Sequence, residues 1–384
     1  MRPKLAARGA DRYAVGKVER FDQKNAMYFR AVWDPSVSEL GKKYFTVFQP
    51  KDKPGYRLED MSFSQAGWYA EQAFAMGNLG GRRGLYSWET PKIWYSDYRL
   101  PTDITLKIDD LDRMSRVIKK TARAYGASLV GICQLDQRWL YSHWQNVMEK
   151  KHDPIVIPDE YRYAISLAFE MDYELLKYSP THIATGGVTT AYGKMAFTTG
   201  MVAQFIRYLG YKAIPSGNDT ALNIPIAIDA GLGELSRMGL LITPQYGPRV
   251  RLSKIFTNLP LATDPPIEFG VWQFCEKCKK CAHSCPGQAI MHGEPTDRAL
   301  NPSNRGGLLR WPADAEKCFR WWGNNNGTCS NCIRVCPFNK APGFLHDAVR
   351  WGVQNTPWLD SLFVRADDWL GYGKPADPAH YWER

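Results

Sequence analysis

The sequence lacks several features that would place it in a common class. Its 384 residues contain no run approaching the ~18 apolar residues of a membrane-spanning helix, no solenoid repeat and no low-complexity tract. No G-x-G-x-x-G fingerprint follows a predicted strand, so a Rossmann-type nicotinamide or flavin fold is unsupported. Between Met1 and Arg30 there is no apolar signal segment and no twin arginine. We therefore expect a folded, soluble protein that works in the cytoplasm or has lost a leader.

Aromatic residues and regular apolar patterns are present instead. The chain has 14 Trp, 20 Tyr and 16 Phe, 13% of all residues, which indicates large flat apolar surfaces that could enclose a planar group. Apolar spacing predicts two helices, at residues 111–126 and at residues 190–209 before Gly210. Short apolar runs predict strands at residues 129–132, 163–169 and 239–243. These elements predict an α+β core in the middle of the chain.

Four segments follow from these patterns. The N-terminal segment is rich in aromatic and turn residues without sustained helical periodicity, so we expect an irregular wrapping unit there. The core follows it, then a cysteine-rich domain, then a short extension. We place these segments at residues 1–104, 105–265, 266–345 and 346–384.

Eight of the nine cysteines lie in the third segment. The first run, C-x2-C-x2-C-x3-C-P, is the bacterial ferredoxin pattern for a [4Fe-4S] cluster and comprises Cys275, Cys278, Cys281 and Cys285. The second run lacks its first thiol because Asn326 stands there, and it comprises Cys329, Cys332 and Cys336. Cys318 is the nearby replacement, which an extra loop must bring in.

The fourth cysteine of such a run binds the other cluster, so the two ligand sets are crossed. We assign one cluster to Cys275, Cys278, Cys281 and Cys336, and the other to Cys285, Cys318, Cys329 and Cys332. Zinc normally takes two Cys-x2-Cys pairs, and disulfides between such close cysteines would be poor staples, so iron–sulfur fits better. Cys133, on an apolar strand, is expected to be an inert core residue. Two adjacent clusters predict electron transfer.

The charge permits a different partner. The 49 basic and 39 acidic residues give +10, which would suit nucleic acid. Eight thiolates and two oxidised cluster cores lower this to about +6, and most basic residues are scattered singly. We therefore expect an ordinary solvated surface and no nucleic-acid partner.

Two segments upstream of the cysteines carry a family resemblance. They are TTAYGKMAFTTG and, after it, IPSGNDTALNIPIAIDAGLGELSRMGLLITPQYGPRVRL. Together with both cysteine runs, they resemble the reductive dehalogenases over about Thr105 to Pro342. The resemblance implies a nitroreductase-like core that binds a base-off corrinoid (cobalamin), fed by two [4Fe-4S] clusters. No D-x-H-x-x-G stretch, which marks a histidine cobalt ligand in other corrinoid proteins, occurs here, in agreement with the resemblance.

The resemblance also implies site residues. Small and polar residues that would wrap the corrin are Ser216, Asn218, Thr220, Ala221, Gly231, Ser236, Met238 and Gly239. Small residues let the backbone approach a large ligand, although each glycine could equally make a simple turn. Tyr192, Asn218 and Arg251 match the residues that line the distal face of the corrinoid in the family.

Tyr192 is the expected proton donor, because removing halide with two electrons leaves carbanion character that must be protonated. We expect it at the start of a helix, where the dipole favours its anion, with Arg251 adding a larger stabilisation. Arg249 and Arg251 alternate along a predicted strand and should face one side. The alternatives are a core tyrosine with a satisfied hydroxyl and a strand-surface arginine.

Four tryptophans are candidates for a hydrophobic substrate funnel: Trp88, Trp94, Trp321 and Trp322. Aromatic walls select small apolar ligands by shape and exclude water. Ordinary packing against the clusters is the alternative for each of them.

The expected function is reductive dehalogenation of a small organohalide by Co(I) corrinoid, with a low-potential electron donor. Epoxyqueuosine reductase, which acts on tRNA, resembles the same core but uses an aspartate where Tyr192 stands. A non-catalytic iron–sulfur electron-transfer subunit is the third possibility. Respiratory members of the resembling family are held at the outer face of the cytoplasmic membrane by a small anchor subunit, and we expect that location after leader removal, with the cytoplasm as the alternative.

Overall fold

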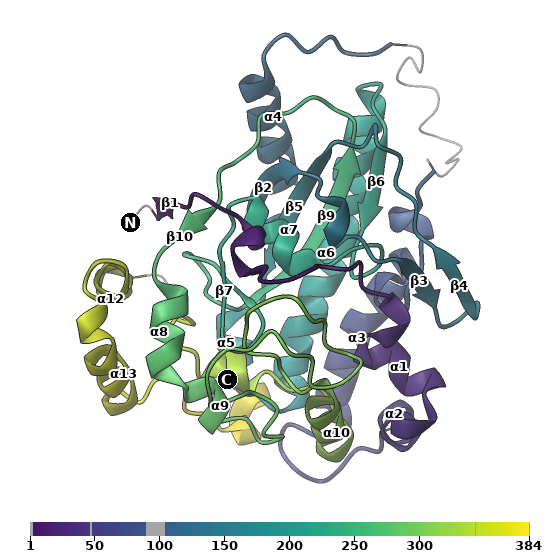
Figure 1. Cartoon of the computed structure of the whole chain (residues 1–384). Coiled ribbons are helices and arrows are strands. Elements are labelled where there is room, and N and C mark those ends of the chain that lie inside the picture. The colour runs from purple at the N-terminus through teal and green to yellow at the C-terminus, as the bar shows by residue number, and fades with distance from the viewer. Residues whose placement is uncertain (1–2, 47, 90–103, 342, 384) are drawn as a thin grey trace.

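The central element is a four-stranded antiparallel sheet with strand order β2-β5-β9-β6 (Figure 1). The computed structural model describes residues 3–46, 48–89, 104–341 and 343–383. The strands are β2 (Leu129–Gln134), β5 (Tyr163–Glu170), β6 (Ala213–Ser216) and β9 (Val250–Thr257). Register pairs Phe169 with Arg251 and Ser216 with Lys254. The predicted strands at residues 129–132 and 163–169 are confirmed, each slightly longer than expected.

Helices cover both faces of this sheet. Alternation along β5 sends Ile165 and Leu167 into one apolar cluster, and Ala164 and Ala168 into another. The first cluster is closed by α4 (Leu111–Ala124) and α6 (His182–Tyr208), and the second by α7 (Asn223–Asp229). The α+β core is therefore confirmed.

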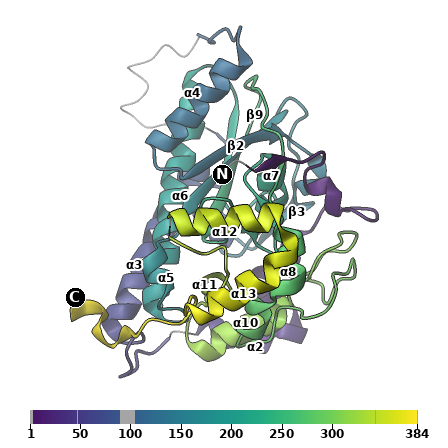
Figure 2. The same cartoon turned by 90° about the vertical axis from the view of Figure 1, so that its left-hand side faces the viewer.

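The N-terminal segment is more helical than predicted. Its helices are α1 (Met27–Trp33), α2 (Ser38–Phe45) and α3 (Leu58–Phe74), and α3 lies along α6 (Figure 2). The two helices approach closely: a Cβ added at Gly67 would lie 2.2 Å from Thr189 Oγ1, and one at Gly186 would lie 2.1 Å from Phe63. The expectation of an irregular unit was wrong because α3 has no clean apolar stripe; polar and apolar residues alternate along it and Gly67 interrupts them.

Helix α6 also starts earlier than predicted, at His182. Gly186 and Gly187 lie within this helix and provide the space for Phe63 of α3 and for Leu175 of α5 (Tyr173–Leu176). Tyr192 therefore lies well inside α6 rather than at its start. Because the helix dipole acts only within the first turn, it does not stabilise a Tyr192 anion, and that part of the prediction was wrong.

The eight clustered cysteines lie beneath the sheet, on short helices and on the turns next to them. The helices are α8 (Val271–Cys278), α9 (Lys280–His283), α10 (Ala315–Asn325) and α11 (Asn331–Arg334). Two further helices, α12 (Phe344–Asn355) and α13 (Asp360–Trp369), lie beside α8 (Figure 1). Asp367 of α13 pairs with Lys280 and with Lys340, the latter at 2.6 Å, which ties the C-terminal helices to the cysteine region.

Three two-stranded ladders complete the described chain. They pair β1 (Lys4–Leu5) with β10 (Ile267–Glu268), β3 (His143–Asn146) with β4 (Lys151–Pro154), and β7 (Glu234–Leu235) with β8 (Leu241–Ile242). The strand predicted at residues 239–243 is the short β8. Among the described residues, none of the helices combines the length and apolarity that crossing a bilayer requires.

Candidate functional site

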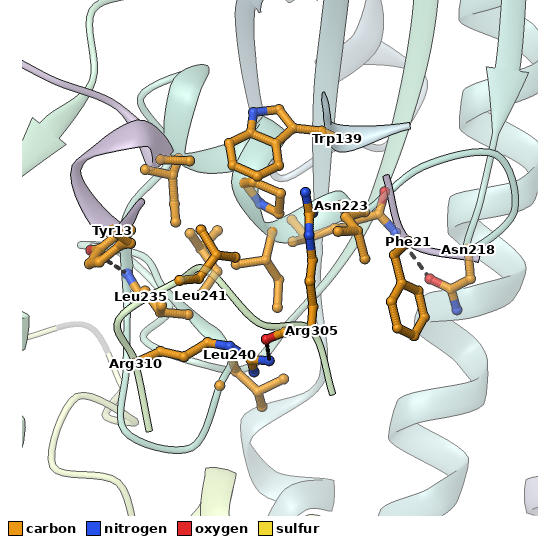
Figure 3. A pocket seen from close by; sticks show the side chains of 18 of the residues that line it. Tyr13, Phe21, Trp139, Asn218, Asn223, Leu235, Leu240, Leu241, Arg305 and Arg310 are labelled. Atoms are coloured by element: carbon orange, nitrogen blue, oxygen red, sulfur yellow. Dashed lines mark hydrogen bonds between the residues drawn. The ribbon is translucent and has the colours of Figure 1, made fainter. Parts of the chain in front are cut away.

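A largely apolar cavity of about 410 Å³ lies between α7, the first residues of β9 and the loops around them (Figure 3). Its wall combines Tyr13 and Phe21 from the N-terminal segment, Trp139 from the core, and Arg305 and Arg310 from the cysteine region. The three residues expected to act together, Tyr192, Asn218 and Arg251, all line it. The structure therefore brings together groups that are far apart in the sequence.

Tyr192 is held by contacts on three sides. Asn218 Nδ2 donates a hydrogen bond to Tyr192 Oη at 3.1 Å. The Arg251 guanidinium lies 5.1 Å from the centroid of the Tyr192 ring, and Trp68 of α3 packs on the same ring with centroids 4.9 Å apart. Because the phenol oxygen accepts from Asn218, its own O–H remains available to donate into the cavity.

Asn218 is itself fixed in position. Its Nδ2 also donates to Asn78 Oδ1 at 2.7 Å, and its Oδ1 accepts from Asn223 Nδ2 at 3.1 Å (Figure 3). Arg251 pairs with Phe169 across the sheet and lies on the α6 side, whereas Arg249 packs over Tyr173 of α5. Both arginines thus face the helices of one sheet face, as the alternation predicts.

A buried lysine, Lys254, organises the loop that carries Asn218. Its Nζ donates to the backbone carbonyls of Gly217, Asp219 and Ala221 at 2.5, 2.7 and 3.0 Å. Thr220 within this loop has a φ of +70°, a conformation that costs energy in a non-glycine residue and needs such support. Burial lowers the pKa of Lys254 to about 7, although the nearby Asp219 opposes this.

A buried glutamate, Glu71 of α3, supports the same network from the other side. Its Oε1 accepts from the backbone N–H of Asn78 at 3.1 Å, and Asn78 in turn accepts from Asn218. Burial raises the pKa of Glu71 to about 7, and the Asn78 amide only partly offsets that rise. Glu71 and Lys254 were missed by sequence reasoning. A lone lysine inside the apolar run of β9 was a usable signal, whereas Glu71 becomes informative only once α3 is known to lie along α6.

Six of the eight residues expected to bind a cofactor divide into three groups by position. Asn218 and Gly239 line the cavity, and a Cβ added at Gly239 would meet no atom within 4 Å. Ser216, Thr220 and Ala221 shape the Lys254 loop rather than the cavity wall. Gly231, with a φ of +71°, makes a tight turn in which an added Cβ would lie 2.4 Å from the Pro265 carbonyl oxygen.

The turn formed by residues 236–240 connects the cavity with the cysteines. Ser236 Oγ closes the turn by donating to the Leu240 carbonyl at 2.7 Å. Arg237 donates to the Cys275 carbonyl at 2.9 Å, and Met238 contacts the first cysteine set, whereas Gly239 and Leu240 line the cavity. One side of this turn therefore faces the large cavity and the other faces thiols.

The structure groups the cysteines as the crossed assignment requires. A small second cavity is lined by Cys275, Cys278, Cys281 and Cys336. Burial raises the pKa of the Cys318 thiol, and the nearby thiols of Cys332, Cys329 and Cys285 raise that pKa further. Cys318 therefore lies close to the other three members of the second set. Cys318 comes from the first turn of α10, the insertion expected to supply it. Cys133 is 5% exposed and lies in the apolar core, as expected.

Three of the four tryptophans expected in a funnel, Trp88, Trp321 and Trp322, lie outside the wall of the large cavity. Trp88 packs against Arg82, whose guanidinium lies 4.2 Å from its ring centroid. Trp322 packs 5.9 Å from the Tyr44 ring, and Trp321 lies beside Gly287. Trp94 falls outside the described residues.

Residues 274–339 match the family model of the 4Fe-4S double cluster binding domain, which confirms the predicted pair of [4Fe-4S] clusters. The chain is 34% identical to tetrachloroethene reductive dehalogenase of Sulfurospirillum multivorans, covering 93% of this chain and 76% of that protein. It is 36% identical to tetrachloroethene reductive dehalogenase of Desulfitobacterium hafniense, covering 77% of this chain and 60% of that protein.

Solved structures agree on the fold. A catabolic reductive dehalogenase in complex with 3-bromo-4-hydroxybenzoic acid matches 97% of this chain with a TM-score of 0.76 at 24% identity. A reductive dehalogenase described as acting in B12-dependent dehalogenation matches with a TM-score of 0.75 at 25% identity. This chain spans 49% of the length of each. Epoxyqueuosine reductase of Lactococcus garvieae is 27% identical over only 31% of this chain. The chain therefore belongs to the reductive dehalogenase family of oxidoreductases.

Proposed function

We propose that this protein removes halide from a small organohalide with electrons delivered through its two clusters, and that Tyr192 supplies the proton. The observation that carries this proposal is the convergence of Tyr192, Asn218 and Arg251 on one apolar cavity. The turn at residues 236–240 lines both that cavity and the small pocket of the first cysteine set.

The cavity wall suits a corrinoid, which would supply a low-valent cobalt for carbon–halogen cleavage. A corrin is large and mostly apolar but carries amide side chains, so its site needs apolar walls with a few free polar groups. Several buried polar atoms of the wall have no partner among the described residues, namely Arg251 Nε, Arg305 Nε and Nη1, and Asn223 Oδ1. Gly239 leaves space at the wall, since a Cβ there would meet nothing. Ser216, Thr220, Ala221, Gly231, Ser236 and Met238 would act indirectly, by shaping the backbone around the ligand.

Tyr192 is suited to act as the acid because its anion would be stabilised where it forms. Asn218 donates to the phenol oxygen, and this hydrogen bond strengthens as negative charge develops there. The Arg251 guanidinium beside the ring adds electrostatic stabilisation in a site with little water. Asn78, Asn223 and Glu71 hold Asn218 so that it does not turn its amide away.

Aromatic side chains behind Tyr192 suit a small apolar substrate. Burial raises the pKa of Tyr28 to about 12, and Glu71 and Tyr192 lie close enough to raise it further. Tyr44 packs 6.1 Å from Tyr28 and 5.9 Å from Trp322, ring centroid to ring centroid. The substrate would lie in the cavity beside Tyr192, with these rings behind it, and among the described funnel tryptophans Trp322 contacts this aromatic group.

The electron path follows from the same arrangement. The set of Cys275, Cys278, Cys281 and Cys336 would be the cluster nearer the cavity, and that of Cys285, Cys318, Cys329 and Cys332 the one that an external low-potential donor reduces first. A membrane anchor subunit and a position at the outer face of the cytoplasmic membrane belong to this proposal as well, with the cytoplasm as the alternative.

The direct test is anaerobic reconstitution with iron, sulfide and cobalamin, followed by a halide-release assay. Tetrachloroethene is the first substrate to try because the S. multivorans and D. hafniense relatives are named for it. We expect corrinoid absorbance that survives gel filtration and chloride release that requires both cofactors and a reduced donor. Cluster absorbance without retained corrinoid would instead support an electron-transfer subunit. Salt-sensitive binding of a tRNA stem-loop would support epoxyqueuosine reduction.

A further inference from the structure

Two histidines and one aspartate converge outside the cavity, on the β3–β4 hairpin. His143 begins β3, and His152 lies on β4 opposite Gln145. Asp22 comes from the N-terminal segment, immediately before the short 3-10 helix at residues 23–25. Three separate stretches of chain therefore contribute one metal-ligating side chain each.

The donor atoms of these side chains face one another. His152 Nε2 lies 3.0 and 3.1 Å from the two carboxylate oxygens of Asp22, and His143 Nδ1 lies 3.9 Å from Asp22 Oδ2. All three donor atoms lie within 4.8 Å of one another, and the two imidazole rings are stacked with centroids 4.8 Å apart. A simple ion pair would need only one imidazole, so the second ring directed at the same carboxylate is the informative feature.

We propose that Asp22, His143 and His152 form a binding site for a divalent transition-metal ion of the Zn²⁺ class. Ligand atoms at the usual ~2.0–2.2 Å from zinc in a tetrahedron lie roughly 3.3–3.6 Å from one another. The separations here run from 3.0 Å to at most 4.8 Å, so small side-chain rotations would bring the atoms to that geometry. Two imidazoles and one carboxylate form a borderline donor set that favours zinc and its neighbours over Mg²⁺ or Ca²⁺. His152 is partly exposed, which leaves a fourth position for water.

Other polar groups nearby permit this role. The Lys24 backbone N–H donates to Asp22 Oδ1 at 3.1 Å, which orients the carboxylate. Ser142 Oγ lies 3.2 Å from His143 Nδ1, and a bound ion would take the place of this hydroxyl at that nitrogen. Lys24 Nζ, at 3.8 Å from Asp22 Oδ2, is the nearest opposing cation. It also lies over the Trp33 ring at 5.5 Å, so it has a second favourable position when an ion binds.

The site would fix one wall of the cavity. Asp22 lies between Phe21, which lines the cavity, and Gln23, which is fully buried. Gln23 accepts from the Gln145 N–H of the hairpin at 2.8 Å and donates to the Asn218 carbonyl at 3.4 Å. A bound ion would cross-link the N-terminal segment to the hairpin and thereby hold both neighbours in place.

The experiment uses the cluster-loaded chain without a histidine tag, titrated with ZnCl₂ by calorimetry. Zinc per chain is then measured by mass spectrometry after gel filtration. We expect one tightly held zinc, and His152→Asn or His143→Asn should weaken it by more than the roughly 10–100-fold cost of losing an outer-shell partner. The control is His380→Asn, because His380 pairs with Glu383 at 2.6 Å without a second imidazole and should leave binding unchanged.

Zinc-edge X-ray absorption identifies the ligands independently of any activity. Two imidazole nitrogens and oxygen in the first shell, together with a zinc-dependent rise in Tm that His152→Asn abolishes, are the results we expect. Sulfur in that shell would place the zinc at the cysteines and overturn the proposal, as would equal zinc binding by His152→Asn and the unaltered chain. Both histidine variants lie at the surface, and unchanged cluster absorbance and zinc-free Tm will verify that they fold. None of these measurements depends on dehalogenation.

Discussion

The cysteine region and the cavity of this protein are assembled in opposite ways. The eight clustered cysteines lie on one continuous stretch, from Cys275 to Cys336, and short helices and their adjoining turns hold them at short spacings along the chain. The cavity wall instead takes residues from Ala10 to Arg310, contributed by the N-terminal segment, the sheet, α6, α7 and a loop of the cysteine region. Spacing along the chain therefore encodes the first site, whereas only the tertiary fold encodes the second.

Paired substitutions are the strongest test of which cysteines bind the same cluster. Cys281→Ser together with Cys336→Ser should remove one cluster, because both belong to the first set, and iron should fall from about 8 to about 4 per chain. Cys332→Ser together with Cys336→Ser should disturb both clusters, although these cysteines are neighbours in sequence. Dehalogenation should be abolished in both variants. Iron analysis and low-temperature electron paramagnetic resonance measure the outcome.

Cys133→Ser is the matched control for these variants, since Cys133 lies in the apolar core away from the cluster region and should leave iron content unchanged. An uncrossed arrangement would give the reverse pattern, with Cys281→Ser and Cys336→Ser destroying both clusters.

On the cavity side, the largest effect is expected from Tyr192→Phe. Removing the phenol O–H while keeping the ring should lower kcat by about 10²–10⁴-fold, the usual contribution of a positioned acid. Cluster and corrinoid absorbance should not change, because the ring still packs between Trp68 and Arg251. Halide release under single-turnover conditions provides the measurement.

Tyr125→Phe is the control for this substitution, since Tyr125 ends α4 away from the cavity. Near-normal halide release by a fully loaded Tyr192→Phe protein would refute the assignment of Tyr192 as the proton donor.

The same contrast explains what could be predicted from sequence. The cysteine spacing was sufficient for two clusters, and the apolar patterns located α4, β2 and β5 closely. The start of α6 was misplaced because the packing that holds Gly186 and Gly187 in the helix comes from α3 and α5, which lie elsewhere in the sequence. The sequence around Arg305 and Glu71 does not indicate their roles. The role of Arg305 depends on partners more than a hundred residues away. The role of Glu71 depends on a helix that lacks an apolar stripe.

Lys254→Met tests whether the cavity depends on the hydrogen bonds that Lys254 donates to the loop carrying Asn218. Leaving three buried carbonyls without a donor lowers the free energy of unfolding by about 3–9 kcal/mol. Removing a buried ammonium group restores part of this free energy, so we expect a net loss of stability of ~3 kcal/mol. Tm should fall, and halide release should fall with it because Asn218 lies in the released loop.

Lys212→Met is the matched control, because Lys212 forms an exposed ion pair with Glu160 at 2.8 Å. Its loss should change Tm far less than the loss of Lys254, because an exposed ion pair contributes little to stability. Equal Tm changes in the two lysine variants would show that the Asn218 loop does not need its buried clamp.

Glu71→Gln should have the smallest effect on halide release, and its effect on stability should appear only as a pH dependence. Burial raises the pKa of Glu71 from 4.5 to about 7, so the folded protein binds more protons than the unfolded chain between these values. The stabilisation linked to its protonated form is complete below the unfolded pKa and is lost as pH rises through about 7. A glutamine cannot ionise, so Glu71→Gln should gain stability relative to the unaltered protein as pH rises across this range, by at most ~3 kcal/mol. Tm measured at a series of pH values gives the difference.

Glu149→Gln provides the contrast for this last measurement. Glu149 is exposed, and its hydrogen bond to Lys151 lowers its pKa, so its contribution is present above the unfolded pKa and is lost as pH falls. The two glutamine variants should therefore differ from the unaltered protein with opposite slopes. A flat difference for Glu71→Gln would mean that Glu71 ionises as freely in the folded chain as in the unfolded one. In that case water would reach the Glu71 carboxylate in the folded chain, and the hydrogen bond that it accepts from the Asn78 N–H would be an exposed contact rather than a buried one.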